Sequence, residues 1–163
     1  MLVVSNTSPL SNLAIIGRLD LLREQLGELH IPPAVRAELD RHPDSEAKAR
    51  LENAISADWI RVVGLFGPVP LEAAATLDAG EAEALARAVQ LDAKMVLLDE
   101  SAARAKAVEL GLAHTGVLGI LRHARRLGRI PSLKTEIQRL RSEVRFFVNP
   151  ILERRLLISV GEE

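Results

Sequence analysis

The sequence predicts an α/β fold in which helices cover both faces of a parallel central sheet. Short apolar runs alternate with helix-like segments along the chain, and this alternation is typical of such a sheet. The chain also has 163 residues, a length that suits a single domain. A chain of this size buries about 70% of the surface that its unfolded form exposes, so it needs no covalent staple.

Four apolar segments are the clearest candidates for strands, at residues 2–5, 28–31, 59–63 and 95–98. The segment 59–63 shows the alternation and the β-branched residues that favour a strand. A shorter run at 113–115 would add another strand. We therefore expect a three-layer α/β/α arrangement whose parallel central sheet has four or five strands.

Helices are expected between these strands. The first should have Thr7 or Ser8 as its N-cap and Pro9 in its first turn, where the missing N–H costs nothing, and should end at Gly17. Further helices are predicted at 19–26, 34–39, 44–55, 80–91, 101–110 and 117–127, with a loop at 64–70 and a helical turn at 71–77. From about residue 132 the chain should continue as a helical C-terminal extension of one domain, 1–163, with two helices separated near 146–150.

Composition excludes several classes of protein. There is no cysteine, so disulfide frameworks, zinc ribbons and thiol catalysis are ruled out. The N-terminus lacks the pattern of a secretory signal, and no apolar run approaches the ~20 residues of a membrane span. We therefore expect a soluble cytoplasmic protein with no membrane partner.

Charge is unevenly distributed along the chain. Residues 122–145 hold eight arginines and lysines against two acids, in a chain whose net charge is −1. This segment is a candidate docking face for RNA or for an acidic protein tail, although a solvated helix surface would look the same. The arginines at its start are Arg122, Arg125, Arg126 and Arg129. Aromatic residues are scarce, which argues against recognition of bases by stacking.

Familiar nucleotide and hydrolase motifs are missing. The sequence has no GxGxxG after its first strand, no GxxxxGK[ST], no GxSxG and no HExxH. The four histidines share no spacing typical of metal ligands, and we expect them to be structural or incidental. Candidate catalytic or metal-binding residues must therefore be sought among the aspartates and glutamates.

In parallel sheets, sites gather at the carboxyl ends of the strands, here residues 5–8, 99–100 and 114–116. Asp99 follows a strand directly, where it could equally cap the next helix. Glu81 and Glu83 lie in the first turn of a helix, where their only role could be a favourable interaction with the helix dipole. Glu38 lies near the C-terminal end of a helix, where a negative charge is mildly disfavoured. Several acids at one sheet edge could hold Mg²⁺, which prefers oxygen ligands and can drive hydrolysis of a phosphodiester.

The chain resembles the PIN-domain superfamily, which includes the ribonuclease toxins of toxin–antitoxin pairs, and is most similar to a branch of short prokaryotic proteins. The matching stretches begin with "VVSNTSPLSNLAIIGRLDLL" and include "AGEAEA" and "LLDE". They occur in the right order over most of the chain, at residues 3–22, 31–39, 77–88, 96–112 and 115–130.

The resemblance implies an acidic cluster that binds Mg²⁺ or Mn²⁺ and cuts RNA. The family's acid positions match Glu38, Glu81 and Asp99 as catalytic metal ligands, and Asn6 stands where active members carry their first acid. Thr7, Ser8 and Thr115 are secondary candidates because small hydroxyl residues often accompany these positions. Arg104 could orient Asp99 or a phosphate, or be an ordinary solvated residue. The implied partners are an RNA substrate, a cognate antitoxin and a second copy in a homodimer.

Asn6 is a departure from the active pattern. An amide oxygen can ligate a metal but supplies no charge and takes no proton, and Asn6 could instead hold its turn by bonding to the backbone. The leading hypothesis is a metal-dependent endoribonuclease, the toxin of a toxin–antitoxin pair. A degenerate member that binds RNA or a partner protein without cleavage is the alternative. A receiver-like or flavodoxin-like module is a third, although the paired acids usual after its first strand are absent.

Overall fold

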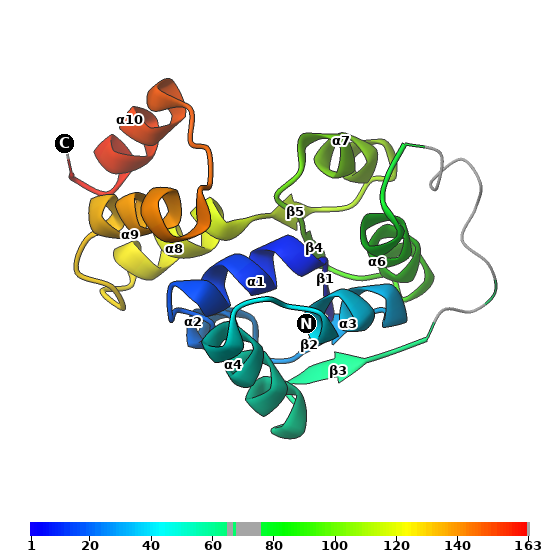
Figure 1. The fold of residues 1–163 in the computed structure, drawn as a ribbon. Helices are drawn as coiled ribbons and strands as arrows, with labels where there is room; N and C mark the ends of the chain where they lie inside the picture. The colour runs from blue at the N-terminus through cyan, green and yellow to red at the C-terminus, as the bar shows by residue number, and fades with distance from the viewer. Residues whose placement is uncertain (65–66, 68–75, 163) are drawn as a thin grey trace.

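A computed structural model of the protein describes residues 1–64, 67 and 76–162. Its centre is a five-stranded sheet, in which every pair of neighbouring strands is parallel, with the order β3-β2-β1-β4-β5 (Figure 1). The strands are β1 (Val3–Ser5), β2 (Leu29–Ile31), β3 (Ile60–Val62), β4 (Met95–Leu97) and β5 (His114–Thr115). The predicted α/β class and the parallel sheet are confirmed.

Alternation along the central strands divides the core between the two faces of the sheet. Val3 of β1 and Leu97 of β4 belong to one hydrophobic cluster, whereas their neighbours Val4 and Val96 belong to another. Successive side chains of a strand point to opposite faces, so these clusters are the two sides of the sheet. The larger cluster includes residues of helices α1 to α4, and the smaller one includes residues of α6 and α7. Helices therefore cover both faces of the sheet, and the predicted three-layer arrangement is confirmed.

The helices before the last strand are α1 (Thr7–Ile15), α2 (Asp20–Leu26), α3 (Pro33–Asp40), α4 (Ser45–Ser56), α6 (Ala79–Gln90) and α7 (Ser101–Glu109). Helix α1 ends at a turn in which Gly17 has φ +71°, a conformation that favours glycine. The predicted cap of α1 is wrong, because Thr7 is already helical and Asn6 is the N-cap residue.

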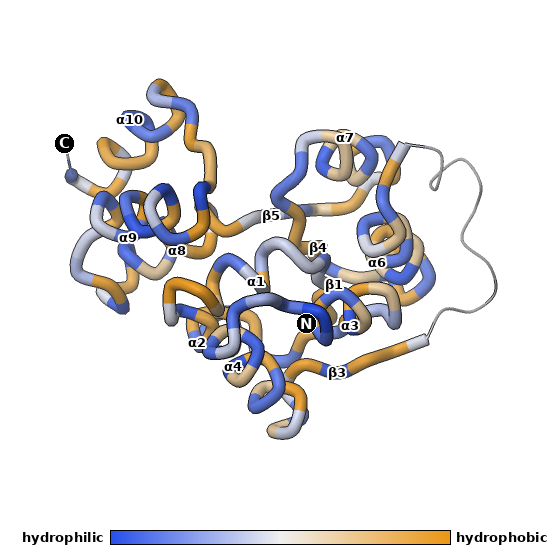
Figure 2. Tube along the Cα trace, in the orientation of Figure 1, coloured by the Kyte–Doolittle hydropathy of each residue, from blue (hydrophilic) through white to orange (hydrophobic). Residues whose placement is uncertain are grey.

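The chain after β5 is helical. It forms α8 (Val117–Arg126), α9 (Leu133–Arg139), a π-helical turn at Leu140–Val144, and α10 (Pro150–Ser159). These helices lie together on the left of Figure 1. Their buried residues, such as Leu121, Ile137 and Leu157, extend the larger core cluster, while Figure 2 shows hydrophobic and hydrophilic residues alternating along α10. The C-terminal helices therefore share the core of the sheet and present a mixed surface to solvent.

Most of the predicted loop at 64–70 and of the helical turn at 71–77 lies outside the described residues. Within the part that the structure describes, no helix has the length and apolar character needed to cross a membrane.

Candidate functional site

The strand order creates a switch point between β1 and β4. From β1 the sheet grows towards β2 on one side and towards β4 on the other. Connections leave the sheet in opposite directions at such a point, and the carboxyl ends of its two strands form a crevice where ligands of α/β proteins commonly bind. Asn6 directly follows β1, and Asp99 lies just beyond β4. The site predicted from the sequence therefore falls where the fold favours a ligand.

Asn6 occupies the N-cap position of α1 without acting as a cap. Its side chain makes no capping hydrogen bond, although the residue is only 3% exposed. Its Oδ1 atom is buried and has no hydrogen-bond partner among the described residues. Buried polar atoms are nearly always paired, so an unpaired one calls for an explanation. The structure therefore contradicts the alternative in which the Asn6 side chain holds its own turn by bonding to the backbone.

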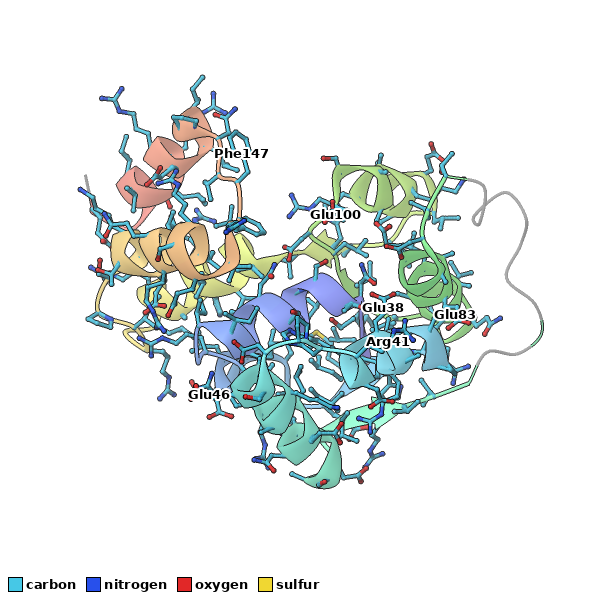
Figure 3. All side chains as sticks on the ribbon, viewed as in Figure 1. Glu38, Arg41, Glu46, Glu83, Glu100 and Phe147 are labelled. Carbon is cyan, nitrogen blue, oxygen red and sulfur yellow. The ribbon has the colours of Figure 1, made fainter. Side chains whose placement is uncertain are left out.

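Glu38 approaches Asn6 across the first turn of α6, where Gly80 lies. A β-carbon placed on Gly80 would stand 2.5 Å from Glu38 Oε1 and 3.1 Å from Asn6 Oδ1. Two oxygens from different elements therefore converge on one point that a glycine leaves open. Figure 3 shows Glu38 on the α3 side of this region, facing α6. The negative charge near the end of α3 thus faces a neighbouring helix.

Glu81 combines a structural role with an unpaired oxygen. It forms a reciprocal capping box with Asp78 at the start of α6, accepting a hydrogen bond from Asp78 N at 3.2 Å. Its other oxygen, Oε2, is buried without a partner in the described part of the chain. Burial, with the nearby acids Asp78 and Glu100, raises the pKa of Glu81 to about 7. A cation beside this carboxylate would favour its charged form.

Asp99 is held in place by groups from distant elements. Its Oδ1 accepts a hydrogen bond from Val117 N at 2.9 Å, and its Oδ2 accepts one from Asn12 Nδ2 at 3.4 Å. It does not cap the following helix α7, whose N-cap is Glu100; it binds the first residue of α8 instead. Burial raises the pKa of Asp99 above its ordinary value. The two hydrogen bonds and the charge of Arg104 lower this pKa, but burial has the larger effect.

Two residues around Asp99 were not predicted from the sequence. Asn12 gave no signal beyond its place on α1, two turns from Asn6. Gly116 gave none beyond its place after the last strand, yet a β-carbon there would collide with Asp99 Oδ1 and stand 2.8 Å from Leu98 O. Only glycine allows the carboxylate to lie where it does.

The secondary candidates occupy varied positions. Arg104 donates from Nε to Leu98 O at 3.0 Å and lies 3.7 Å from Asp99 Oδ1, so it orients the acid and is not simply a solvated residue. Thr7 Oγ1 is buried without a partner among the described residues. Thr115 Oγ1 packs against Gly119 of α8. Ser8 is partly buried in the first turn of α1.

The arginines of the predicted docking face are largely engaged within the protein. Arg122 Nε donates to Ser159 Oγ at 2.8 Å, and Arg125 Nε donates to Glu162 Oε2 at 3.1 Å. Arg129 lies 3.7 Å from Glu24. Arg126 is exposed on α8. Much of this charge therefore joins α8 to α10 and α2.

Among the described residues, no three Asp, Glu or His side chains are gathered closely enough to hold a metal ion between them. Two oxygens converge beside Gly80, Asn6 Oδ1 and Glu38 Oε1. The unpaired Oε2 of Glu81 belongs to the next residue of α6. Mg²⁺ commonly binds proteins through one or two carboxylates and keeps several waters. A buried, unpaired amide oxygen that meets a carboxylate oxygen at a point left open by Gly80 suits a hard cation of this kind.

Comparison with known proteins identifies the family and supports the fold. A family model described as a PIN domain matches residues 2–162. Among solved structures, the chain is similar to a PilT N-terminus domain protein from the hyperthermophilic archaeon Sulfolobus solfataricus P2, with 17% identity and a TM-score of 0.59. That match covers 76% of this chain and 93% of the archaeal chain. At this level of identity, it shows a similarity of fold only. No curated protein matches the chain.

Proposed function

Because the chain belongs to the PIN-domain family, a nuclease-type fold, we propose that it is a divalent-metal-dependent endoribonuclease. PIN domains typically use divalent metals and have RNA or proteins as partners. The observation that carries the proposal is that two buried oxygens have no partner among the described residues: Asn6 Oδ1 at the switch point of the sheet, and Glu81 Oε2 at the start of α6. Leaving such atoms unpaired costs about 1–3 kcal/mol each, which a bound cation would offset.

Asn6, Glu38 and Glu81 would hold the ion, and Asp99 would complete the negative site from the neighbouring strand. When bound, Mg²⁺ or Mn²⁺ supplies an activated water and neutralises charge on the phosphate. Asn12 and the N-terminus of α8 orient Asp99, and Arg104 forms an ion pair with the same oxygen that the N-terminus of α8 binds. Arg104 is also partly exposed, so its guanidinium is available to a substrate phosphate.

The wider role proposed is that of a toxin of a toxin–antitoxin pair. The support is the resemblance of most of the chain to the PIN-domain superfamily, which includes ribonuclease toxins, together with the matching PIN family model. It carries the expectation of a cognate antitoxin and of a homodimer. Light scattering on the purified chain measures the oligomeric state directly, and a monomer across the micromolar range would remove the dimer from the proposal.

The experiment is cleavage of a fluorescently labelled single-stranded RNA at micromolar protein, with Mn²⁺ or with chelator. Wild type should cleave only with metal. Glu38→Gln should lower the rate by ~100-fold or more, the size expected for removing one charge that stabilises the transition state. Glu46→Gln is the matched control, because Glu46 is an exposed acid on α4 (Figure 3). Equal loss in both variants, or cleavage that survives chelator, would overturn the proposal.

A second function is favoured by one observation: Asn6 removes a charge from a site in which no three acidic or histidine side chains of the described residues come together. A degenerate PIN domain would bind RNA or a protein without cutting. RNA retained in a gel shift but intact after long incubation with Mn²⁺ would support this function over the first.

A further inference from the structure

The outer face of α10 exposes an unusual amount of apolar surface. Phe147, just before the helix, is 82% exposed, and Ile151 and Ile158 are 67% and 62% exposed. Seven residues separate Ile151 from Ile158, so these two lie on one side of the helix, and we call them the apolar stripe. A single apolar residue on a surface needs no explanation, but several exposed apolar residues along one helix are typical of a binding surface. Figure 3 shows Phe147 on the segment that leads into this helix.

A groove runs beside this stripe, between α9 and α10. It has a volume of about 660 Å³, which falls in the range of ligand and peptide sites. Two of the residues that line it are apolar, the buried Leu157 and the exposed Ile158. The lining residues are Lys134, Pro150, Glu153, Arg154, Leu157 and Ile158. We refer to this groove and the stripe together as the α10 surface.

The charge of the α10 surface is positive, because its acids are already paired. Glu153 binds Arg141, and Glu162 is occupied by Arg125 and by groups at the start of α9. Arg154 and Arg155, by contrast, are exposed and make no hydrogen bond or ion pair with the described residues. They lie between Ile151 and Ile158 on the outer side of the helix, so apolar and basic groups alternate along it.

The α10 surface is held in shape before any partner arrives. Arg145 adopts a left-handed conformation with φ 59°, and Phe146 N donates to Leu140 O at 3.0 Å. Asn149 Oδ1 then caps α10 by accepting a hydrogen bond from Ile151 N at 2.8 Å. A preformed surface loses little conformational freedom on binding, which favours affinity.

We infer that the α10 surface docks an acidic, amphipathic segment of another protein. Apolar side chains of such a segment would cover the stripe and enter the groove, and its carboxylates would meet Arg154 and Arg155. This is helix-in-groove recognition. The inference goes beyond the proposed nuclease function, because α10 lies at the end of the molecule away from α6 and α7 (Figure 1).

Other occupants fit less well. In a symmetric pair of this chain, the same patch of both copies forms the interface, so Arg154 and Arg155 of both copies would add positive charge without any acid to neutralise it. A nucleic acid would satisfy the arginines but leave Ile151 and Ile158 uncovered, with Phe147 as the one exposed aromatic of the described residues for stacking. A membrane surface is flat and would not fill the groove.

The test selects peptides from a displayed library of 16-residue segments on the full-length protein, with counter-selection on the double variant Arg154→Glu, Ile158→Gln. Selected peptides should be acidic with apolar residues at helical spacing. A synthetic peptide of this kind should bind the wild type in a fluorescence anisotropy assay. Arg154→Glu and Ile158→Gln should each weaken it by about tenfold, whereas Arg126→Glu, a charge reversal on the exposed side of α8, should change it less than twofold. Both positions are exposed, so all variants should keep the wild-type melting temperature.

Three outcomes would overturn the inference: no enrichment, enrichment of peptides without acids, or equal weakening by Arg126→Glu. Labelled single-stranded RNA and anionic phosphatidylserine vesicles are tested in parallel. If their binding, and not that of peptide, depends on Arg154 and Ile158, the surface serves nucleic acid or lipid instead. The double variant should cleave RNA at the wild-type rate, so failure here and failure of the nuclease proposal are separate results.

Discussion

At the scale of single residues, Asn6 and Gly80 define the character of the site. Asn6 brings a neutral oxygen close to Glu38, and Gly80 leaves room for both. A neutral amide avoids the repulsion that two neighbouring carboxylates would suffer without a cation. The same choice lowers the attraction for a cation, because charge count tunes affinity at oxygen sites.

Replacing Asn6 by aspartate should therefore separate stability from metal binding. Asn6→Asp adds an uncompensated charge to a buried position and should cost the metal-free protein on the order of 2 kcal/mol, or roughly 4–8 °C of melting temperature. Excess Mn²⁺ should restore more stability in the variant than in wild type, and any RNA cleavage should rise. Four melting curves, each protein with chelator and with Mn²⁺, measure this. A metal-induced gain no larger in the variant would mean that position 6 does not contact the ion.

Gly80→Ala tests the open point directly. The new methyl group would displace the carboxylate of Glu38, whose flexible end can move, while alanine gains up to about 1 kcal/mol over glycine inside a helix. We expect the melting temperature to stay within a few degrees of wild type, while Mn²⁺ affinity falls by about tenfold. Isothermal titration with Mn²⁺ gives the affinity. Unchanged Mn²⁺ binding in a well-folded variant would show that the ion does not lie beside Gly80.

At the scale of elements, Glu162 joins the three C-terminal helices. Its carboxylate accepts hydrogen bonds from Leu133 N at 2.7 Å, from Ser132 Oγ at 2.9 Å and from Arg125 Nε at 3.1 Å. The chain end after α10 is thereby fixed to the start of α9 and to α8. Burial alone would raise the pKa of Glu162, but these bonds outweigh it and hold the pKa below its ordinary value.

The stabilisation from Glu162 should depend on pH. Since its folded-state pKa is depressed, the contribution is complete above the unfolded value of about 4.3 and is lost as pH falls through the folded value. Glu162→Gln should lower stability by about 1 kcal/mol at neutral pH, as for loss of a helix cap. The gap in melting temperature from wild type should be constant at neutral pH and close in acid. Glu46→Gln, at an exposed acid, should show no such gap, and a gap for Glu162→Gln that persists in strong acid would refute this assignment.

At the scale of the whole molecule, the basic segment 122–145 is divided between internal and external roles. Arg125 serves the Glu162 contact, whereas Arg126, one residue later, is exposed. A count of charges along the sequence treats the two alike. In the folded chain, Arg125 contributes to stability, whereas Arg126 is accessible to solvent and to partners.

These two neighbours make a matched pair for RNA binding. Arg126→Gln should reduce the dependence of log affinity on log salt by about one, as expected for the loss of a phosphate contact, and leave the melting temperature unchanged. Arg125→Gln should instead lower the melting temperature by a few degrees. Gel-shift titrations at several salt concentrations, with melting curves alongside, separate the two effects. A salt slope that is the same for Arg126→Gln and wild type would remove RNA from this face of α8.

Much of the architecture was predictable from the sequence because its signals are local. Apolar runs of a few residues indicated all five strands to within a few residues, and the ends of helices at Gly17 and Gly128 follow from the positive φ that both residues adopt. The resemblance to PIN domains also located Asn6, Glu38, Glu81 and Asp99 as candidates. Each of these predictions depends on neighbours close in the chain or on a motif quoted from it.

Only the tertiary structure decided how those residues meet. Asn12 bonds to Asp99 from 87 positions away, Gly80 lies against Asn6 and Glu38, and Glu162 caps a helix that begins 29 residues earlier. The prediction that Thr7 or Ser8 caps α1 failed because both belong to the helix, and Asn6, in the cap position, leaves its oxygen to the site. Local patterns specify which segments are strands and helices. Contacts between them depend on strand order and on how the whole chain buries its apolar faces, and no short window of sequence contains that information.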